Sequence, residues 1–420
     1  MATSSSAAVS SSFCSRWAAL PQDVLIKIAS LQTFPPDLFR FRSVCRSWRS
    51  AALAAASLNL LPHLPSPFLM FSDDADPHTR CFYSVQEDKV FRLRFPEDSR
   101  GWRCCGSSHG WLAMLGPDVG ARLFHPFSGA LLDLPPLTTL PGVRRLEEDD
   151  LCRSDAPKFE HQTQVTSCGM MFNMTVGAEV IRDVYVEKAV LAMDPSSDPG
   201  STVVLLLLHD LAGLVYAKPG DQAWTVLPTP PGVDSFKDVV YHDGFFYGLS
   251  YNYEMVVTID IFSGNRPIVE KYEQPVSEWT HCGGSYLVVV PLGVIGVILQ
   301  VTRTTTRDSG PRRTVSFHVF AFVPGEVNKW VEVRALPGIS LFLDGNCSTA
   351  LYTSSVPGKS RSNCIYFGHD DRYPGYLHTT AFSDRDFGLF RLEDKAFERG
   401  FPAGVKMSTI KRPQWVMLSN

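Results

Sequence analysis

The residues of this sequence that could support nucleophilic chemistry gather in one short stretch, residues 104–109. Two cysteines, two serines and a histidine stand there: Cys104, Cys105, Ser107, Ser108 and His109. A serine nucleophile needs a base beside it in space and an acid that orients the base, and closeness in the sequence supplies neither. We interpret residues 106–111 as a turn that leads into a strand at residues 110–115. The sequence also lacks Walker, GxSxG and HExxH motifs, so we expect no catalytic activity.

The same stretch is a weak candidate for a metal site. Cys104, Cys105 and His109 could supply ligands, but a second ligand pair at metal spacing is missing. The chain has ten cysteines and no CxxC pair. We therefore predict buried thiols in a reducing compartment, with no metal ion and no cofactor.

The overall composition is that of an ordinary globular chain with more than one folding unit. Its 420 residues exceed the size at which a single core stops growing, and 45% of them are hydrophobic. The net charge of −4 does not suit a protein that coats nucleic acid. The longest apolar run, residues 286–301, falls short of the ~20 residues that span a bilayer and contains Pro291, so it predicts two buried strands. We expect neither a nucleic-acid nor a membrane partner, and a location in the cytoplasm and/or nucleus.

Residues 17–58 have the pattern of two or three short helices. In residues 20–31 apolar side chains recur at intervals of three and four, and Pro21 suits a first helical turn because it needs no hydrogen-bonded N–H. A second pattern restarts behind two prolines and runs to residue 58. A unit this small rarely stabilises itself, so part of its apolar stripe is expected to be buried against the rest of the chain or a partner.

The stretch FRFRSVCRSWRS, residues 39–50, combines an apolar stripe with four arginines: Arg40, Arg42, Arg46 and Arg49. Residues 14–60 carry six basic and two acidic groups, a net charge of +4, so the remainder carries −8. A DNA-reading helix would need a basic supporting surface, and an interfacial membrane helix would need a longer apolar face. A protein partner fits best, with Trp48 as an anchor and arginines that steer association with an acidic surface. The alternative is that the stripe packs inside the helical unit, and both are expected to hold in part.

From about residue 67 the sequence consists of strand-length apolar runs separated by turn residues. A Trp-led strand that is followed by Leu-Pro occurs at residues 223–232 and again at residues 329–338. Residues 130–137 have a similar strand with Leu-Pro but without the Trp. Asp243-Gly244 is a strong signal for a two-residue hairpin turn. Repeats of this kind predict a β-propeller, with five or six blades of four strands.

The sequence WAALPQDVLIKIASLQTFPPDLFRFRSVCRSWRS resembles an F-box over about residues 15–55, although the TF before Pro35 makes its link slightly longer. The resemblance rests on the Leu-Pro start, the proline-bearing link and the Val-Cys-x-x-Trp ending. It implies docking on a Skp1-like adaptor, which is acidic in this family, and through it on a cullin. It assigns adaptor binding to eight residues: Leu20, Pro21, Leu25, Ile28, Leu38, Val44, Cys45 and Trp48.

The remaining sequence is similar to the plant KIB-type β-propeller. Segments such as GSSHGWLAML, LFHPFSGALLDLPPL, DVVYHDGFFYGLS and RPQWVMLSN occur in the family's order, with His125 in place of the usual Asn. The expected fold class is a small all-α N-terminal F-box, a short helical bundle, followed by an all-β propeller. The expected boundaries are a disordered tail at 1–13, the F-box at 14–58, a linker at 59–67 and the propeller at 68–420.

Together the two resemblances imply a non-catalytic substrate-receptor subunit of an SCF-type ubiquitin ligase. The F-box would hold the Skp1-like adaptor, and the propeller would hold a protein target of unknown identity for ubiquitination. Two alternatives stay open: a small-ligand sensor that uses the propeller channel, and a protein-interaction module outside any ligase.

Overall fold

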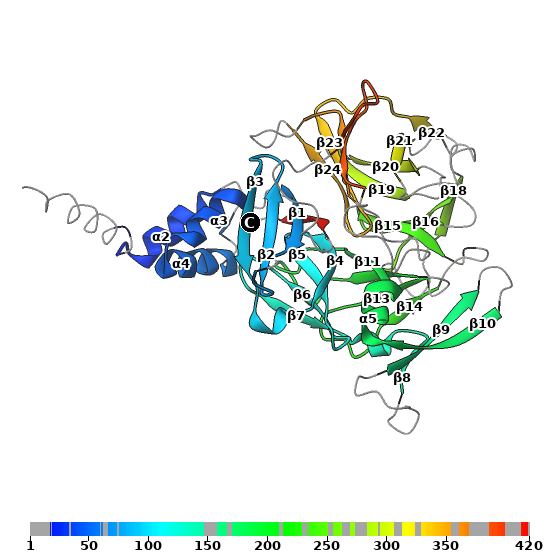
Figure 1. The fold of residues 1–420 in the computed structure, drawn as a ribbon, viewed down its shortest axis with the longest axis horizontal. Helices are drawn as coiled ribbons and strands as arrows, with labels where there is room; N and C mark the ends of the chain where they lie inside the picture. The colour runs from blue at the N-terminus through cyan, green and yellow to red at the C-terminus, as the bar shows by residue number, and fades with distance from the viewer. Residues whose placement is uncertain are drawn as a thin grey trace, which may run out of the picture.

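The computed structural model has a small helical unit at one side of a strand-rich body (Figure 1). The three helices of this unit are α2 (Gln22–Ser30), α3 (Pro35–Ser43) and α4 (Arg46–Ser57). The structure describes residues 17, 19–32, 35–58, 60–61, 66–73, 75–146, 158–165, 170–209, 213–228, 233, 235–250, 255–262, 269–273, 284–292, 295–305, 313–323, 329–353, 361–368, 386–399 and 413–418. The predicted tail at 1–13 lies outside these residues.

The helices begin and end where the local sequence favours it. Pro21 stands just before α2, and Asp23 in its first turn interacts favourably with the positive end of the helix dipole. Pro35 is the first residue of α3, where its missing N–H is not needed. Cys45 has an extended backbone, with φ −163° and ψ 178°, and this separates α3 from α4. The predicted pattern of two or three short helices is therefore confirmed.

Six sheets of the described strands form propeller blades. The first blade contains β28 (Gln414–Leu418), β1 (Ser66–Ser72), β2 (Thr79–Ser84) and β3 (Lys89–Arg94). The second contains β4 (Arg103–Ser108), β5 (Trp111–Leu115), β6 (Ala121–Phe124) and β7 (Leu131–Leu134). The third contains β11 (Val186–Leu191), β12 (Val204–Leu208), β13 (Leu214–Ala217) and β14 (Thr225–Leu227).

The other three blades follow in chain order. The fourth contains β15 (Phe236–His242), β16 (Phe245–Ser250), β17 (Met255–Ile259) and β18 (Val269–Glu273). The fifth contains β19 (Ser285–Leu292), β20 (Ile295–Thr305), β21 (Thr314–Val323) and β22 (Lys329–Glu332). The sixth has the order β24 (Ser348–Tyr352), β23 (Ile339–Leu343), β25 (Cys364–Phe367), β26 (Gly388–Arg391) and β27 (Phe397–Arg399).

The ring closes by pairing the last strand of the chain with the first. β28 runs antiparallel to β1, with Phe68 opposite Val416. The innermost strands β28, β4, β11, β15, β19 and β24 then lie side by side in this order. Between the sixth and first blades, Asn346 donates from Nδ2 to Oε1 of Gln414 at 2.9 Å. Six described blades agree with the predicted five or six, and the all-α unit followed by an all-β propeller is confirmed.

A three-stranded sheet interrupts the chain between the second and third blades. It consists of β8 (Val143–Arg145), β9 (Lys158–Val165) and β10 (Met170–Gly177), and it projects from the body on the side away from the helices (Figure 1). The chain then returns through α5 (Ala178–Val180) and η4 (Ile181–Tyr185). Two short 3₁₀ turns, η1 (Glu97–Ser99) and η2 (Leu137–Thr139), occur elsewhere. This sheet was not predicted from the sequence, because β8 and β9 consist mostly of polar residues.

The internal repeat corresponds to the outermost strand of three blades. The Trp-led motifs form β14 and β22, and the motif without the Trp forms β7. The predicted hairpin turn at Asp243-Gly244 joins β15 to β16, and both residues have the positive φ that such a turn requires. Each motif therefore forms the outermost strand of its blade.

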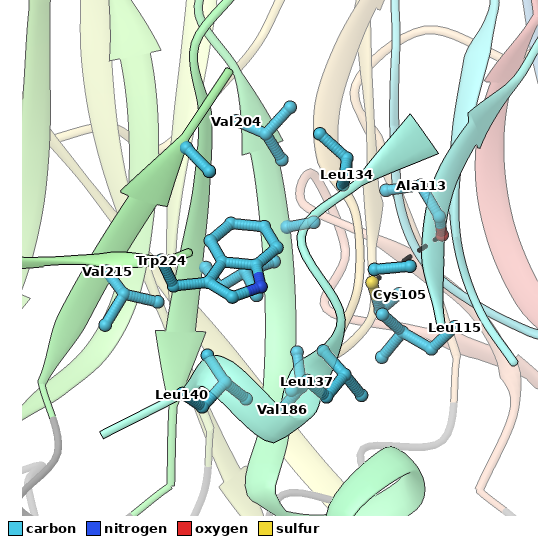
Figure 2. Packing of buried hydrophobic residues seen from close by; sticks show 14 of the residues in the cluster. Cys105, Ala113, Leu115, Leu134, Leu137, Leu140, Val186, Val204, Val215 and Trp224 are labelled. Atoms are coloured by element: carbon cyan, nitrogen blue, oxygen red, sulfur yellow. Dashed lines mark hydrogen bonds between the residues drawn. The ribbon is translucent and has the colours of Figure 1, made fainter. Parts of the chain in front are cut away.

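The core lies between neighbouring blades, and Figure 2 shows the part that joins the second and third blades around Trp224. The Trp224 ring lies among Leu137, Leu140, Val204 and Val215, and its Nε1 donates to the main-chain oxygen of Pro135 at 2.9 Å. A buried indole with its one donor satisfied fixes the orientation of one blade on the next.

Candidate functional site

The helical unit is the candidate site, and its interior is built from small residues. Leu25 and Ala29 of α2 are buried, as are three alanines of α4: Ala51, Ala52 and Ala55. Alanine has the highest helix propensity and lets two helices approach closely. The two helices consequently pack against each other through a face with few large side chains, which leaves larger apolar residues outside this contact.

Several of these apolar side chains are exposed. Val24 is 39% exposed, Leu31 63%, Val44 55% and Trp17 56%. Val24, Ile28 and Leu31 are spaced four and three residues apart, so they follow one side of α2. Four exposed large apolar side chains on such a small unit favour a protein-interaction surface.

The eight predicted adaptor-binding residues fall into three groups by their burial. Leu25 and Leu38 are 1% and 0% exposed, and they pack in the core cluster that the helices share with the first two blades. Pro21 and Val44 are exposed. The other four are partly buried: Leu20, Ile28, Cys45 and Trp48. In this fold Leu25 and Leu38 can only support a surface that the other six residues help to form.

Trp48 is held in one position at the edge of this surface. Its indole Nε1 donates to the main-chain oxygen of Trp17 at 3.0 Å, and its ring lies 4.5 Å from that of Phe41. Trp17 was not among the predicted site residues, nor were Val24 and Leu31. The three- and four-residue spacing on α2 carried the signal for Val24 and Leu31, but the family pattern did not select them.

The four arginines do not all face the same way, which corrects the expectation that they rim one docking surface. Arg40 pairs with Asp37 at 2.5 Å and with Glu87 of the β2–β3 turn, and Arg42 donates to two main-chain oxygens of the second blade. Arg46 and Arg49 are exposed at the start of α4. Burial, together with the charge of Arg49, lowers the pKa of Arg42 to about 10, so this guanidinium stays charged at neutral pH.

The polar side chains near the propeller axis bind one another and the main chain. Arg103 of β4 donates to the main-chain oxygens of Arg182 and Val186 at 2.6 and 2.8 Å, and to Oδ1 of Asn346 at 3.3 Å. Lys188 of β11 and Asp238 of β15 form a buried ion pair at 2.6 Å. These groups connect blades, and donors already engaged in this way are poorly placed to bind a ligand.

Residues 104–109 form most of β4 and the start of the turn that follows it. Ser107 lies in β4, where its Oγ accepts a hydrogen bond from the Met417 main-chain N–H at 2.8 Å. The turn is confined to His109 and Gly110, so the predicted turn over 106–111 is too long. Within the described residues, no three His, Cys, Asp or Glu side chains form a group that could hold a metal ion.

No helix in the described part of the chain is both long enough and apolar enough to cross a membrane.

Comparison with known proteins agrees with this division into a helical unit and a propeller. Residues 82–391 match the KIB1-4 β-propeller family, and residues 17–58 match the F-box-like family. The F-box protein SKIP23 of Arabidopsis thaliana is 26% identical over 396 residues, which cover 89% of this chain and 88% of that protein. The F-box protein At5g25290 of the same plant is 24% identical over 435 residues, which cover 96% of this chain and 97% of that protein.

Proposed function

Because this chain is a plant F-box protein and belongs to the KIB1-4 β-propeller family, we propose that it is the substrate-receptor subunit of an SCF-type ubiquitin ligase. The F-box helices would bind a Skp1-like adaptor and, through it, a cullin. The propeller would bind the protein target. The chain itself would supply no catalytic group, and it would act in the cytoplasm and/or nucleus.

The observation that carries this proposal is the exposed apolar surface of the helical unit. Val24, Leu31 and Val44 remain exposed although the unit already packs against the propeller through α3. Burial of an exposed Val or Leu side chain contributes on the order of 1.5–3 kcal/mol. Such a surface therefore favours a stable partner, and the exposed Arg46 and Arg49 match an acidic one.

The receptor would accelerate ubiquitination by proximity. An adaptor held at one end and a target held on the propeller raise the effective concentration of a target lysine near the ubiquitin-loaded enzyme. This role needs two binding surfaces and a rigid connection between them. A small-ligand sensor would need polar groups at the propeller axis that can bind a ligand, whereas Arg103, Lys188 and Asp238 already bind other groups of the chain. We therefore favour the receptor role.

The test is to place a charge on the exposed apolar surface. Val24→Asp and Val44→Asp should each reduce co-purification with a Skp1-like adaptor at least tenfold, because a carboxylate would be buried without a partner. Val226→Asp is the matched control, since Val226 lies on β14 of the propeller and is 51% exposed. Circular dichroism should show all three variants folded. Undiminished adaptor binding by both helical variants would overturn the proposal.

A further inference from the structure

The F-box helices and the propeller share one hydrophobic core. Phe39 of α3 is 5% exposed, and its ring lies between 5.0 and 5.8 Å from four other phenylalanine rings. These rings belong to the first two blades and to the turns between their strands: Phe68, Phe82, Phe91 and Phe127. The core cluster runs without interruption from Leu25 in α2 to Leu418 in β28. The helical unit is therefore joined to the propeller by side-chain packing as well as by the main chain.

Polar contacts also restrict the orientation of α3 on the first two blades. We call this contact between α3 and the two blades the seam. The Arg42 guanidinium donates from Nη1 to the main-chain oxygens of Pro126 and Phe127 at 3.0 and 2.6 Å, and it lies 5.8 Å from the centre of the Phe127 ring. Hydrogen bonds from a charged donor are stronger than those between neutral groups, and their geometry is specific. Arg42 thus fixes how α3 is rotated on the second blade.

A second attachment lies on the first blade. Arg40 pairs with Glu87 in the turn between β2 and β3, and its guanidinium lies 5.5 Å from the centre of the Phe91 ring in β3. The register of β1 with β2 places this turn beside the start of β1, where the chain arrives from the helices. The two attachments lie on separate blades, so each opposes a rotation of α3 about the other.

We propose that Phe39 and Arg42 are positioning residues that hold the adaptor-docking surface at one fixed orientation to the propeller. This role of Phe39 and Arg42 rests on the proposed ligase function. A target bound to a rigid receptor reaches the enzyme in one pose, so only those lysines that lie near the thioester react. In that step the lysine amine attacks the thioester carbonyl of the loaded ubiquitin, an isopeptide bond forms, and the enzyme's cysteine leaves as a thiol after taking up the proton.

The seam can be tested without any target. Spectroscopic labels introduced as unnatural amino acids at Ser50 of α4 and Asp221 of the propeller, both exposed, report the distance between the two units. The wild-type chain should give one narrow distance distribution. Arg42→Ala and Phe127→Ala should each broaden it at least twofold, Arg42→Lys should broaden it less, and the control Arg46→Ala should leave it narrow. Phe127→Ala alters only the propeller side, so it keeps the test valid if the helical variant is unstable. Unchanged widths in both variants would overturn the inference.

The positioning role is tested by the pattern of self-modification. In a ligase reconstituted with Skp1-like adaptor, cullin and loaded enzyme, the wild-type propeller should be ubiquitinated at a few lysines. Arg42→Ala should retain adaptor binding but at least double the number of modified lysines, and Arg42→Lys should restore the narrow pattern. A broadened distance with an unchanged lysine pattern would reject the positioning role. Failure of the wild-type chain to bind adaptor would instead overturn the proposed function, while the distance measurement would still decide the rigidity of the seam.

Discussion

Arg42 of α3 donates a hydrogen bond to the main-chain oxygen of Phe127 at 2.6 Å, across 85 residues of sequence. The contact joins the F-box helices to the turn between the third and fourth strands of the second blade. The sequence pattern predicted that the Arg42 charge would serve an external partner, but in the structure it serves this contact within the chain. The helical unit consequently has two sides: α3 faces the propeller, while exposed residues of α2 and the start of α4 remain available for the proposed adaptor.

Loss of the Lys188 charge should destabilise the propeller strongly. Asp238 would keep its hydrogen bonds from the main-chain N–H groups of Val239 and Leu287 but lose its ion partner, and breaking a buried pair costs about 3–5 kcal/mol. Urea unfolding of Lys188→Met measures this. The double variant Lys188→Met/Asp238→Asn should lose less than the sum of the single losses. A loss below about 1 kcal/mol for Lys188→Met would contradict the assignment of this pair as a blade-to-blade contact.

Asp386 should make stability depend on pH in the acid range. Burial by itself would raise the pKa of Asp386, but the Arg303 charge and the hydrogen bonds from Thr314 outweigh it and hold the pKa below the usual 3.8. The unfolded chain therefore binds the proton more readily, so the stabilisation is full above about pH 4 and is lost as the pH falls through the lower folded-state value.

The measurement is urea unfolding of Asp386→Asn at pH 7 and at pH 3. At pH 7 the variant should be less stable by about 3–5 kcal/mol, because the substitution removes the carboxylate that pairs with the buried Arg303 guanidinium, and the difference should shrink at pH 3. Asp394→Asn is the control: the pKa of Asp394 is also lowered, first by a hydrogen bond from Arg391, but this pair is exposed and should contribute little. A difference that grows at pH 3 would contradict the prediction.

Cys45 should report adaptor binding through its reactivity. It is partly exposed, whereas the other free cysteines of the described residues are buried. Burial raises the pKa of Cys105 to about 11 and that of Cys347 to about 12, which suppresses their reactive thiolates. Mass-mapped alkylation should modify Cys45 at least tenfold faster than these two, and a Skp1-like adaptor should slow only Cys45. Equal rates with and without adaptor would place Cys45 outside the docking surface.

Arg46 and Arg49, at the start of α4, should govern how fast the adaptor binds. Arg46→Glu/Arg49→Glu should reduce the association rate about tenfold at low salt and by much less at high salt, since screening weakens the steering of an acidic partner. Arg334→Glu reverses one charge at a propeller side chain that is 86% exposed, and it should have no effect. Stopped-flow association with a Skp1-like adaptor is the measurement, and an association rate independent of salt would show that Arg46 and Arg49 do not steer.

The amino-acid sequence by itself determined the two folding units and the repeated blades. Helical spacing on α2, the prolines at the starts of α2 and α3, and the Trp-led motifs that form the outermost strands β14 and β22 are local features, so they could be recognised without contacts. The sheet of β8–β10 was missed because β8 has only three residues and β9 is mostly polar, so that β10 is its one strand with a clear apolar alternation.

Only the tertiary structure decided which side chains of the helical unit face outward. Leu25 and Val24 are neighbours in one periodic pattern, yet one is 1% exposed and the other 39%. Likewise Arg42 and Arg46 are equally charged, but Arg42 bonds to Phe127 and Arg46 faces solvent. The physical reason is that burial depends on what packs against a helix face. For α3 that partner is a pair of blades whose phenylalanines are far away in the sequence, and no local pattern encodes their position.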